Sequence, residues 1–347
     1  MARSLHIVAT WPLERGGHPG DAGTRNGSHT QMGNDTMRAI GQDEFGGPEV
    51  LRVMEVDRPE PGISEVLVRV HATGVNPTDL WHRGSGGLLG TTVRLGWDLS
   101  GVVQEVGLGV TWLRPGDEVF GMPRLPEAAG TYADYVTAPA RHLARKPAGL
   151  SHVEAAGLGL AGLTAWQALV DTAEVRAGQR VLIHAAAGGV GHLAVQIAKA
   201  RGAYVIGTAS AAKHELVRGL GADEVIDYTA VRFEDVATDL DVVVDPIGGE
   251  YGPRSLGALR PGGVLVSLAS PAEAYLADEA RERGRRAGFL LVQPDHAGLR
   301  SLAELVERGQ LRVVVDTVLP LEDVAKAHDL VATGRSAGKV VLTVSDH

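Results

Sequence analysis

The sequence predicts an α/β protein in which a β-rich domain is joined to a doubly wound parallel sheet. Three observations carry this prediction. Between residues 37 and 148, short stretches alternate apolar and polar residues with the period of a half-buried strand. From residue 180 onward, apolar strands alternate with helical segments, which is typical of a parallel sheet. The first of these strands runs into a glycine-rich turn and a helix. A chain of 347 residues is long enough for two such domains.

The glycine-rich turn is the most specific of these features. Residues 180–202 read RVLIHAAAGGVGHLAVQIAKARG, with a buried strand at 181–183 and a helix that Gly202 ends. Glycines in such a turn let the backbone approach a pyrophosphate, and the free N–H groups of the helix start bind its charge. A tight strand–helix turn without a ligand is the alternative. The turn predicts a dinucleotide site at Gly188, Gly189, Val190 and Gly191.

Composition narrows the class of protein. The net charge of −9 makes a nucleic-acid partner unexpected. The absence of cysteine excludes disulfides and thiolate metal ligands, and fits a reducing cytoplasm. No apolar run approaches the length of a membrane span. Residues 1–36 are rich in Gly, His, Arg, Thr and Asn without periodicity, so we expect either a disordered leader or an upstream start there, with Met37 opening the folded part. The absence of cysteine makes a cytoplasmic protein the expectation.

The β-rich region begins at Met37. Strands are expected at 51–56, 65–75, 101–107, 116–121 and 130–136. Prolines and glycines separate them, beginning with Pro59, Pro61 and Gly62.

Beyond residue 150 the pattern becomes helical. Ser151 with Glu154 three residues on forms a capping box, which predicts the start of a helix. Six parallel strands are then expected at 180–186, 203–209, 224–228, 241–247, 263–269 and 288–294. Two helices at 299–309 and 321–334 and two strands at 313–320 and 338–344 complete the chain.

Nine stretches resemble one known family. They include GVNPTDLWHRG, GWDLSGVVQEVG, RPGDEVFG, GTYADYV, AAAGGVG, LRPGGVLVSLAS and GKVVL, in that order. The chain resembles the medium-chain dehydrogenase/reductase superfamily, and most of all its zinc-free quinone oxidoreductase (zeta-crystallin-like) branch. The resemblance implies a GroES-like β-rich catalytic domain at 37–157 and 294–347, interrupted by a Rossmann cofactor domain at 158–293. It also implies an active site in the cleft between the two domains.

The chain departs from the zinc members of this superfamily at two positions. Those members carry Cys where this sequence has Asn76, and His where it has Trp97. A catalytic zinc needs three protein ligands, so we expect no metal. Without a Lewis acid the substrate must supply its own electrophilicity. Quinones and α,β-unsaturated carbonyls do so, because hydride addition gives a delocalised oxyanion.

The candidate catalytic residues follow from that chemistry. Asn76 and Thr78 are expected to donate hydrogen bonds to the oxyanion, and Trp81 to stack on a flat substrate. Ordinary turn chemistry is the alternative for Asn76 and Thr78. Asp79 is expected to be a structural partner and Trp97 a packing residue. No proton donor is evident, which leaves solvent to protonate the product.

The residues at the end of the second strand of the parallel sheet indicate whether the cofactor is NADH or NADPH. NAD sites place an acid there, whereas this chain has Ala209 and Ser210, followed by Lys213. Ser210, Lys213 and Tyr228 are expected to hold a 2′-phosphate, which predicts NADPH. Alternatively, Lys213 is a solvated helix residue and Tyr228 a strand-end aromatic. The resemblance adds residues expected along the cofactor: Thr164, Ile247, Leu268, Ala269 and Lys339, with Thr164 alternatively bonded back to its own helix.

The predicted function is reduction of quinones or activated double bonds with NADPH. Three alternatives stay open: an enoyl reductase of a biosynthetic pathway, a non-enzymatic NADPH-binding protein of the crystallin kind, and an alcohol dehydrogenase with an unusual metal site. We also expect a homodimer, because the apolar strand at 288–294 would lie at a sheet edge. No nucleic-acid or membrane partner is expected.

Overall fold

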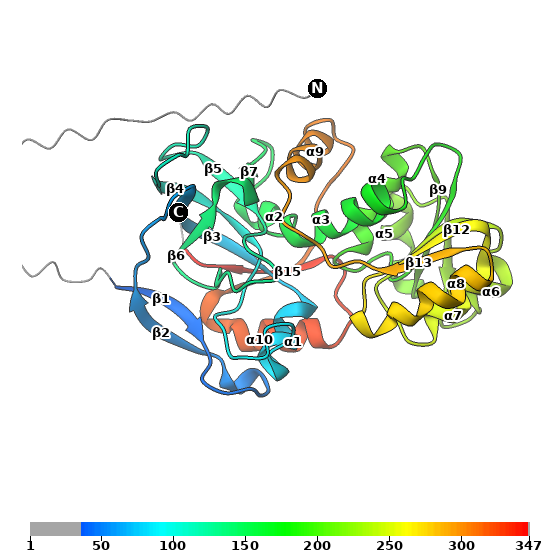
Figure 1. The fold of residues 1–347 in the computed structure, drawn as a ribbon, viewed down its shortest axis with the longest axis horizontal. Coiled ribbons are helices and arrows are strands. Elements are labelled where there is room, and N and C mark those ends of the chain that lie inside the picture. The colour runs from blue at the N-terminus through cyan, green and yellow to red at the C-terminus, as the bar shows by residue number, and fades with distance from the viewer. Residues whose placement is uncertain (1–35, 346–347) are drawn as a thin grey trace, which may run out of the picture. The chain divides into compact units, whose positions relative to one another are not determined.

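The structure is a computed structural model that describes residues 36–345. The predicted leader therefore lies outside the described residues, apart from its last position. The described chain forms two large sheets and one small one (Figure 1). This arrangement confirms the predicted α/β class.

A six-stranded sheet forms the cofactor domain. All its strands are parallel, in the order β10-β9-β8-β11-β12-β13. Their bounds are β8 Arg180–Ile183, β9 Tyr204–Ala209, β10 Glu224–Asp227, β11 Leu240–Asp245, β12 Leu259–Ser267 and β13 Arg286–Phe289. The order reverses beside β8, so a crevice opens at the carboxyl ends of the strands at that point.

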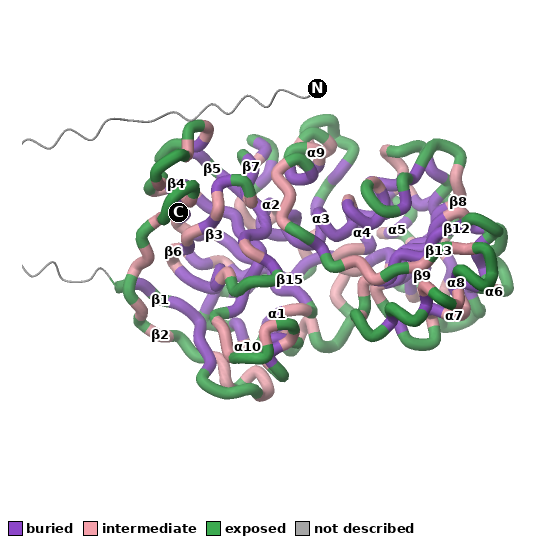
Figure 2. Tube along the Cα trace, viewed as in Figure 1, coloured by how far each residue is buried: buried purple, intermediate pink, exposed green. Residues whose placement is uncertain are grey.

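Alternate residues of these strands enter two separate cores. Val181 and Ile183 belong to the same apolar cluster as helix α4 (Gly191–Ala200), whereas Leu182 belongs to the cluster of helices α6 (Phe233–Val236), α7 (Tyr251–Ala258) and α8 (Leu276–Glu282). Because side chains of a strand point alternately to opposite faces, this division means that helices cover both faces of the sheet. The inner strands β8, β9 and β11 are accordingly mostly buried, whereas β13 contains no buried residue (Figure 2). The sheet is doubly wound, as predicted.

The second sheet belongs to the catalytic domain and has the order β14-β15-β3-β4-β5-β7, with β6 also paired to β3. Its last strand pairs antiparallel with β3, Val340 opposite Val75, so the end of the chain returns to its first half. A two-stranded sheet of β1 and β2 lies apart from it in the pairing scheme. The bounds are β1 Thr36–Gly41, β2 Arg52–Asp57, β3 Glu65–Val75, β4 Leu99–Val106, β5 Glu118–Gly121, β6 Tyr135–Pro139, β7 Leu143–Arg145, β14 Val315–Pro320 and β15 Lys339–Thr343.

Helix ends follow their sequence signals. Ser151 caps α2 (His152–Ala156) together with Glu154, whose carboxylate accepts the Ser151 N–H at 2.9 Å. Gly202 ends α4 with a φ of +80°. The remaining helices are α1 Pro77–Ser85, α3 Gly159–Trp166, α5 His214–Gly219, α9 His296–Glu307 and α10 Val324–Ala332, with a π-helix at Gln167–Thr172.

Asn76 is the N-cap of helix α1, so the turn that was the alternative reading of this stretch is the first turn of a helix. Two expectations about local structure are wrong. Residues 130–134 form no strand, because Gly130 turns at a φ of +75° and the Thr131 and Tyr132 N–H groups donate to Gly96 and Leu95. The sixth parallel strand ends at Phe289, and residues 290–292 line a cavity instead of continuing it.

Candidate active site

Two adjoining cavities lie at the carboxyl ends of the parallel strands. The first has a volume of about 330 Å³ and the second about 270 Å³. Five residues line both of them, and Asn76 is the only one of the five with a polar side chain. The shared residues are Asn76, Pro77, Leu160, Val190 and Pro246.

The predicted glycine turn lines the first cavity. Gly188, Gly189 and Gly191 all contribute to its wall, at the N-terminus of α4. A Cβ on Gly191 would overlap the carbonyl oxygen of Ala185 and stand 2.8 Å from the Cα of Ala186. Glycine is therefore needed for the turn to close. The cavity, the exposed turn backbone and the helix N-terminus fit the pyrophosphate of a dinucleotide.

Two of the three residues expected around a 2′-phosphate follow the carboxyl ends of neighbouring strands in the parallel sheet. Ser210 directly follows β9 and Tyr228 directly follows β10, and these strands are neighbours. Lys213 is half-buried, and its Nζ donates to the carbonyl oxygens of Arg335 at 2.6 Å and Ser336 at 3.1 Å. The carboxylate in register with Ala209 is Asp227, which accepts the Thr229 N–H and hydroxyl.

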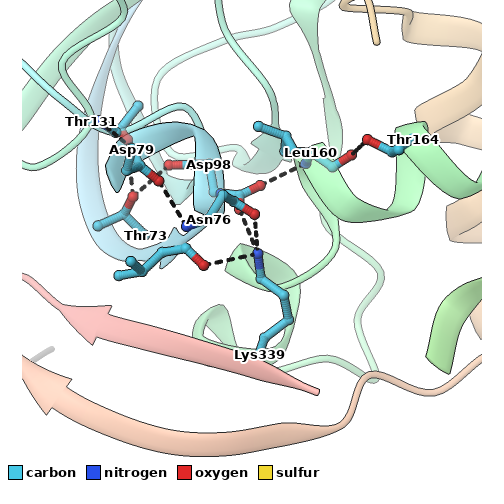
Figure 3. A network of polar contacts seen from close by, with 10 residues as sticks. Thr73, Asn76, Asp79, Asp98, Thr131, Leu160, Thr164 and Lys339 are labelled. Atoms are coloured by element: carbon cyan, nitrogen blue, oxygen red, sulfur yellow. Dashed lines mark hydrogen bonds and ion pairs between the residues drawn. The ribbon is translucent and has the colours of Figure 1, made fainter. Parts of the chain in front are cut away.

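A buried polar network stands where the two cavities meet (Figure 3). The Asn76 amide Nδ2 donates to Asp98 Oδ2 at 2.8 Å, while its Oδ1 accepts a hydrogen bond from the Lys339 ammonium. Lys339 Nζ also lies 3.2 Å from Asp98 Oδ2 and 3.4 Å from the Val75 carbonyl oxygen. The other Asp98 oxygen accepts the Leu160 N–H at 2.6 Å. Three distant segments of the chain therefore converge on one carboxylate.

Asp79 lies in the same region, but its carboxylate accepts hydrogen bonds from backbone N–H groups. Its two oxygens accept the N–H groups of Asn76 at 2.8 Å and Gly96 at 3.0 Å. Burial raises the pKa of Asp79 to about 7; the Asp98 charge adds to this, whereas the two N–H bonds and Lys339 oppose it. The carboxyl is a structural partner at the start of α1, as expected.

The second cavity contains most of the other predicted side chains. Thr78, Trp81, Thr164, Leu268 and Ala269 line it, whereas Ile247 lines the first cavity. The Thr164 hydroxyl donates to the Leu160 carbonyl oxygen at 2.8 Å, which is the hydrogen bond within its own helix that was the alternative interpretation.

The two tryptophans of this region differ in accessibility. Trp81 is 43% exposed and lines the second cavity. Trp97 is fully buried, and its indole N–H donates to the Glu127 carbonyl oxygen at 2.7 Å. Trp97 is therefore a packing residue, and Trp81 is the one that a substrate could reach.

Sequence reasoning missed Asp98 and the apolar wall of the second cavity. Asp98 lies in the GWDLSG stretch beside Trp97. No periodic pattern in the sequence indicates that this carboxylate is buried between Lys339 and the Asn76 amide. Leu125 and residues 289–292 reach the cavity from distant segments, which only the fold brings together.

A zinc ion does not fit the residues present. Asn76 and Trp97 stand at the ligand positions of zinc relatives, and the Trp97 indole is engaged in packing. Throughout residues 36–345, no three His, Asp or Glu side chains are grouped so that they could hold a metal. Within the same range, no helix is long and apolar enough to cross a membrane.

Comparison with known proteins agrees with this architecture. Residues 62–148 match a family described as alcohol dehydrogenase GroES-like domain, and residues 220–342 match one described as zinc-binding dehydrogenase. A quinone oxidoreductase of Sus scrofa is 33% identical over 89% of this chain and 98% of that protein. The mitochondrial NAD(P)H oxidoreductase RTN4IP1 of Danio rerio is 33% identical over 88% of this chain and 90% of that protein.

Solved structures agree as well. The quinone oxidoreductase of Coxiella burnetii superposes with a TM-score of 0.85 at 38% identity, covering 89% of this chain and all of that one. The CurK enoyl reductase superposes with a TM-score of 0.81 at 27% identity, covering 90% of this chain and all of that one.

The GroES-like domain, the Rossmann domain and the glycine-lined cavity between them define a nicotinamide-dependent oxidoreductase. The chain belongs to the medium-chain dehydrogenase/reductase superfamily, within which it is an NAD(P)H oxidoreductase similar to the quinone oxidoreductases.

Proposed function

We propose that this protein is a zinc-independent, NADPH-dependent reductase of neutral, apolar quinones, with activated enones as poorer substrates. The observation that carries the proposal is the lining of the second cavity. It contains no Asp, Glu, His, Lys, Arg or Tyr, and its polar side chains are Asn76, Thr78 and Thr164. Such a cavity favours a flat, uncharged electrophile, because a charged group would lose its hydration without gaining a partner.

Asn76 is the proposed donor to the reacting oxygen. Gly188, Gly189 and Gly191 would hold the pyrophosphate of NADPH, which would supply the hydride when bound. Asn76 Nδ2 carries two hydrogens, of which one is bonded to Asp98. Because Asn76 lines both cavities, the second is the hydrogen proposed to donate to the reacting oxygen. A donor fixed in advance is stronger against the developing oxyanion than mobile water is. Thr78 is a weaker candidate, because its hydroxyl already lies 3.3 Å from His82 Nδ1.

The proton requirement separates quinones from enones. A quinone that accepts a hydride becomes a hydroquinone anion, and its oxygen takes a proton from water in a fast step. An enone needs a proton on carbon, which is slower without a positioned acid. Because no titratable side chain lines the second cavity, quinones are the better substrates.

The preference for NADPH over NADH is proposed from the residues that follow the carboxyl ends of β9 and β10. The proposed site offers two hydroxyls and one ammonium, from Ser210, Tyr228 and Lys213. The carboxylate of Asp227, which pairs with Ala209 across the two strands, already accepts hydrogen bonds from Thr229. A 2′-phosphate gains charge-assisted hydrogen bonds at such a site.

The test is NADPH oxidation against matched substrates. We expect 1,4-naphthoquinone to be reduced. Its 2-sulfonate is charged and, because the sulfonate withdraws electrons, at least as electrophilic, yet it should be reduced at least tenfold more slowly. Trp81→Ala should lower kcat/KM for naphthoquinone about threefold to tenfold through lost stacking, with NADPH affinity unchanged. Trp112→Ala is the matched control, since Trp112 lies beside His296 in a separate groove. Equal rates on both quinones would contradict the proposal.

Enoyl reduction of acyl thioesters is the second candidate, favoured by the structural similarity to the CurK enoyl reductase. A crotonyl thioester reduced faster than naphthoquinone would support it. Tight NADPH binding without turnover of either class would instead support a non-enzymatic role.

A further inference from the structure

Lys339 lines the first cavity, where its sequence position suggests a contact to the cofactor. Its surroundings argue for another role. The side chain is 2% exposed and the paired Asp98 is fully buried. An ammonium has three N–H donors, and three acceptors surround this one: Asn76 Oδ1, Asp98 Oδ2 and the Val75 carbonyl oxygen. No N–H remains for a phosphate or a ribose.

Lys339 and Asp98 together fix the orientation of the Asn76 amide. With Lys339 at Oδ1 and Asp98 at Nδ2, a flipped amide would set an N–H donor against the ammonium and an oxygen against the carboxylate. Both new contacts would be repulsive in a buried site, where charges are poorly screened. Polarisation by the ammonium on Oδ1 also strengthens Nδ2–H as a donor.

We infer that Lys339 is a positioning residue: the buried Lys339–Asp98 pair holds the Asn76 amide so that its free N–H donates to the reacting carbonyl oxygen. This inference rests on the proposed function, in which Asn76 is the oxyanion donor. In this role the Lys339 ammonium does not bind the cofactor. The aliphatic part of its side chain still lies beside the glycine turn, with Cδ 3.4 Å from the position that a Cβ on Gly189 would occupy.

The pair also explains why the donor stays in place while substrates enter and leave. Asp98 is tied to the start of α3 through Leu160 N–H, and Lys339 begins β15, which is paired with β3. The Asn76 backbone is tied in turn to Asp79. Every group around the amide is therefore anchored to regular secondary structure, which preserves its geometry.

The experiment is a double-mutant cycle of Lys339→Met and Asn76→Ala, read out as the single-turnover rate of hydride transfer to naphthoquinone under saturating NADPH. Lys339→Met should slow the step about tenfold to a hundredfold in the wild-type background, because the donor is misplaced and not removed. In the Asn76→Ala background the same change should slow it less than about threefold, because residues that act as a unit are not additive. Independent factors that multiply would overturn the inference.

A binding measurement tests the place of Lys339 without turnover. Fluorescence titration should give Lys339→Met an NADPH Kd within about threefold of the wild type, since its N–H groups are used inside the protein. A rise of tenfold or more would assign Lys339 to the cofactor and overturn the inference. If the wild type reduces no quinone, the proposed function fails, and this titration still decides whether Lys339 contacts the cofactor.

Two further variants control for folding. Lys199→Met removes an ammonium of the same kind from an ion pair with Asp223, away from both cavities, and should leave the hydride-transfer rate unchanged. Lys339→Gln keeps an amide donor at the buried position and replaces Lys339→Met in the cycle if that variant does not fold. The same non-additivity with Asn76→Ala is expected, and its absence would again overturn the inference.

Discussion

The α-carbon of Gly191 lies so close to the carbonyl oxygen of Ala185 that no side chain fits between them. We expect Gly191→Ala to destabilise the protein by about 1–3 kcal/mol, because the neighbouring atoms are backbone and cannot move aside cheaply. Urea unfolding measures this change.

Gly189→Val is the contrasting substitution in the same turn. The nearest atom to its Cβ would be Lys339 Cδ at 3.4 Å, an ordinary contact, so the fold should survive. The side chain would stand in the cavity wall and weaken NADPH and NADH binding alike. Equal stability losses in both glycine variants would contradict this contrast in the space available at the two positions.

Lys213→Ala tests the choice of cofactor. A hydrogen bond to a charged group contributes roughly 1.5–3 kcal/mol, so NADPH affinity should fall about tenfold to a hundredfold while NADH affinity stays nearly constant. Ser210→Asp should shift the preference toward NADH, because it places a carboxylate after β9, where NAD sites carry one. Titration with both cofactors measures this.

The same titration can also show that Lys213 has a different role. Lys213 also holds the Arg335 and Ser336 carbonyl oxygens, and Ser336 lines the first cavity. If Lys213→Ala weakens both cofactors equally, the lysine supports that segment and does not bind a 2′-phosphate.

The buried Asp79 carboxyl makes stability depend on pH. Its pKa of about 7 in the folded protein lies above the ordinary value of 3.8, so the folded state binds the proton more tightly than the unfolded state does. The contribution of Asp79 to stability is therefore complete below about pH 4 and declines as pH rises to about 7, by up to roughly 1.4 kcal/mol per pH unit.

Asp79→Asn isolates that contribution, because it removes the titrating group and leaves the others. The stability of the wild type relative to this variant should fall between pH 5 and pH 7 and level off above. The variant should also be less stable at pH 5, since an amide has one acceptor oxygen for the two N–H groups of Asn76 and Gly96. A difference independent of pH would show that the carboxyl is ionised throughout.

A homodimer is expected from the edge of the parallel sheet. Within the described residues, β13 pairs only with β12, so its other edge is free, and the half-buried Leu290 and exposed Leu291 follow it. Sedimentation velocity at micromolar concentration should give the mass of a dimer. A single species of 36.4 kDa would contradict this prediction.

The sequence was most informative where local pattern and tertiary role coincide. Strand β3 has the predicted bounds, because Val66, Val68 and Val70 enter the core at alternate positions. The Ser151 capping box begins a helix as expected. The stretch at 130–134 misled for the opposite reason. Its alternation matches a strand, but hydrogen bonds to Gly96 and Leu95 hold it as a loop.

The site was less predictable than the fold. Motif resemblance located Asn76, the glycine turn and Lys339, yet gave no account of what joins them. The Lys339–Asp98 contact links residues 241 positions apart, and neither side chain has a local signal for burial. Pairing of β15 with β3 is what makes that contact possible, and it is a property of the whole topology.

The return of β15 to β3 also determines when the enzyme can mature during its synthesis. A growing chain that has reached residue 300 already contains all six strands of the parallel sheet, but neither β14 nor β15. Asp98 has been made by then and still lacks its buried counter-ion. The cofactor domain can therefore fold on the ribosome, whereas the active site is completed only after β15 has emerged.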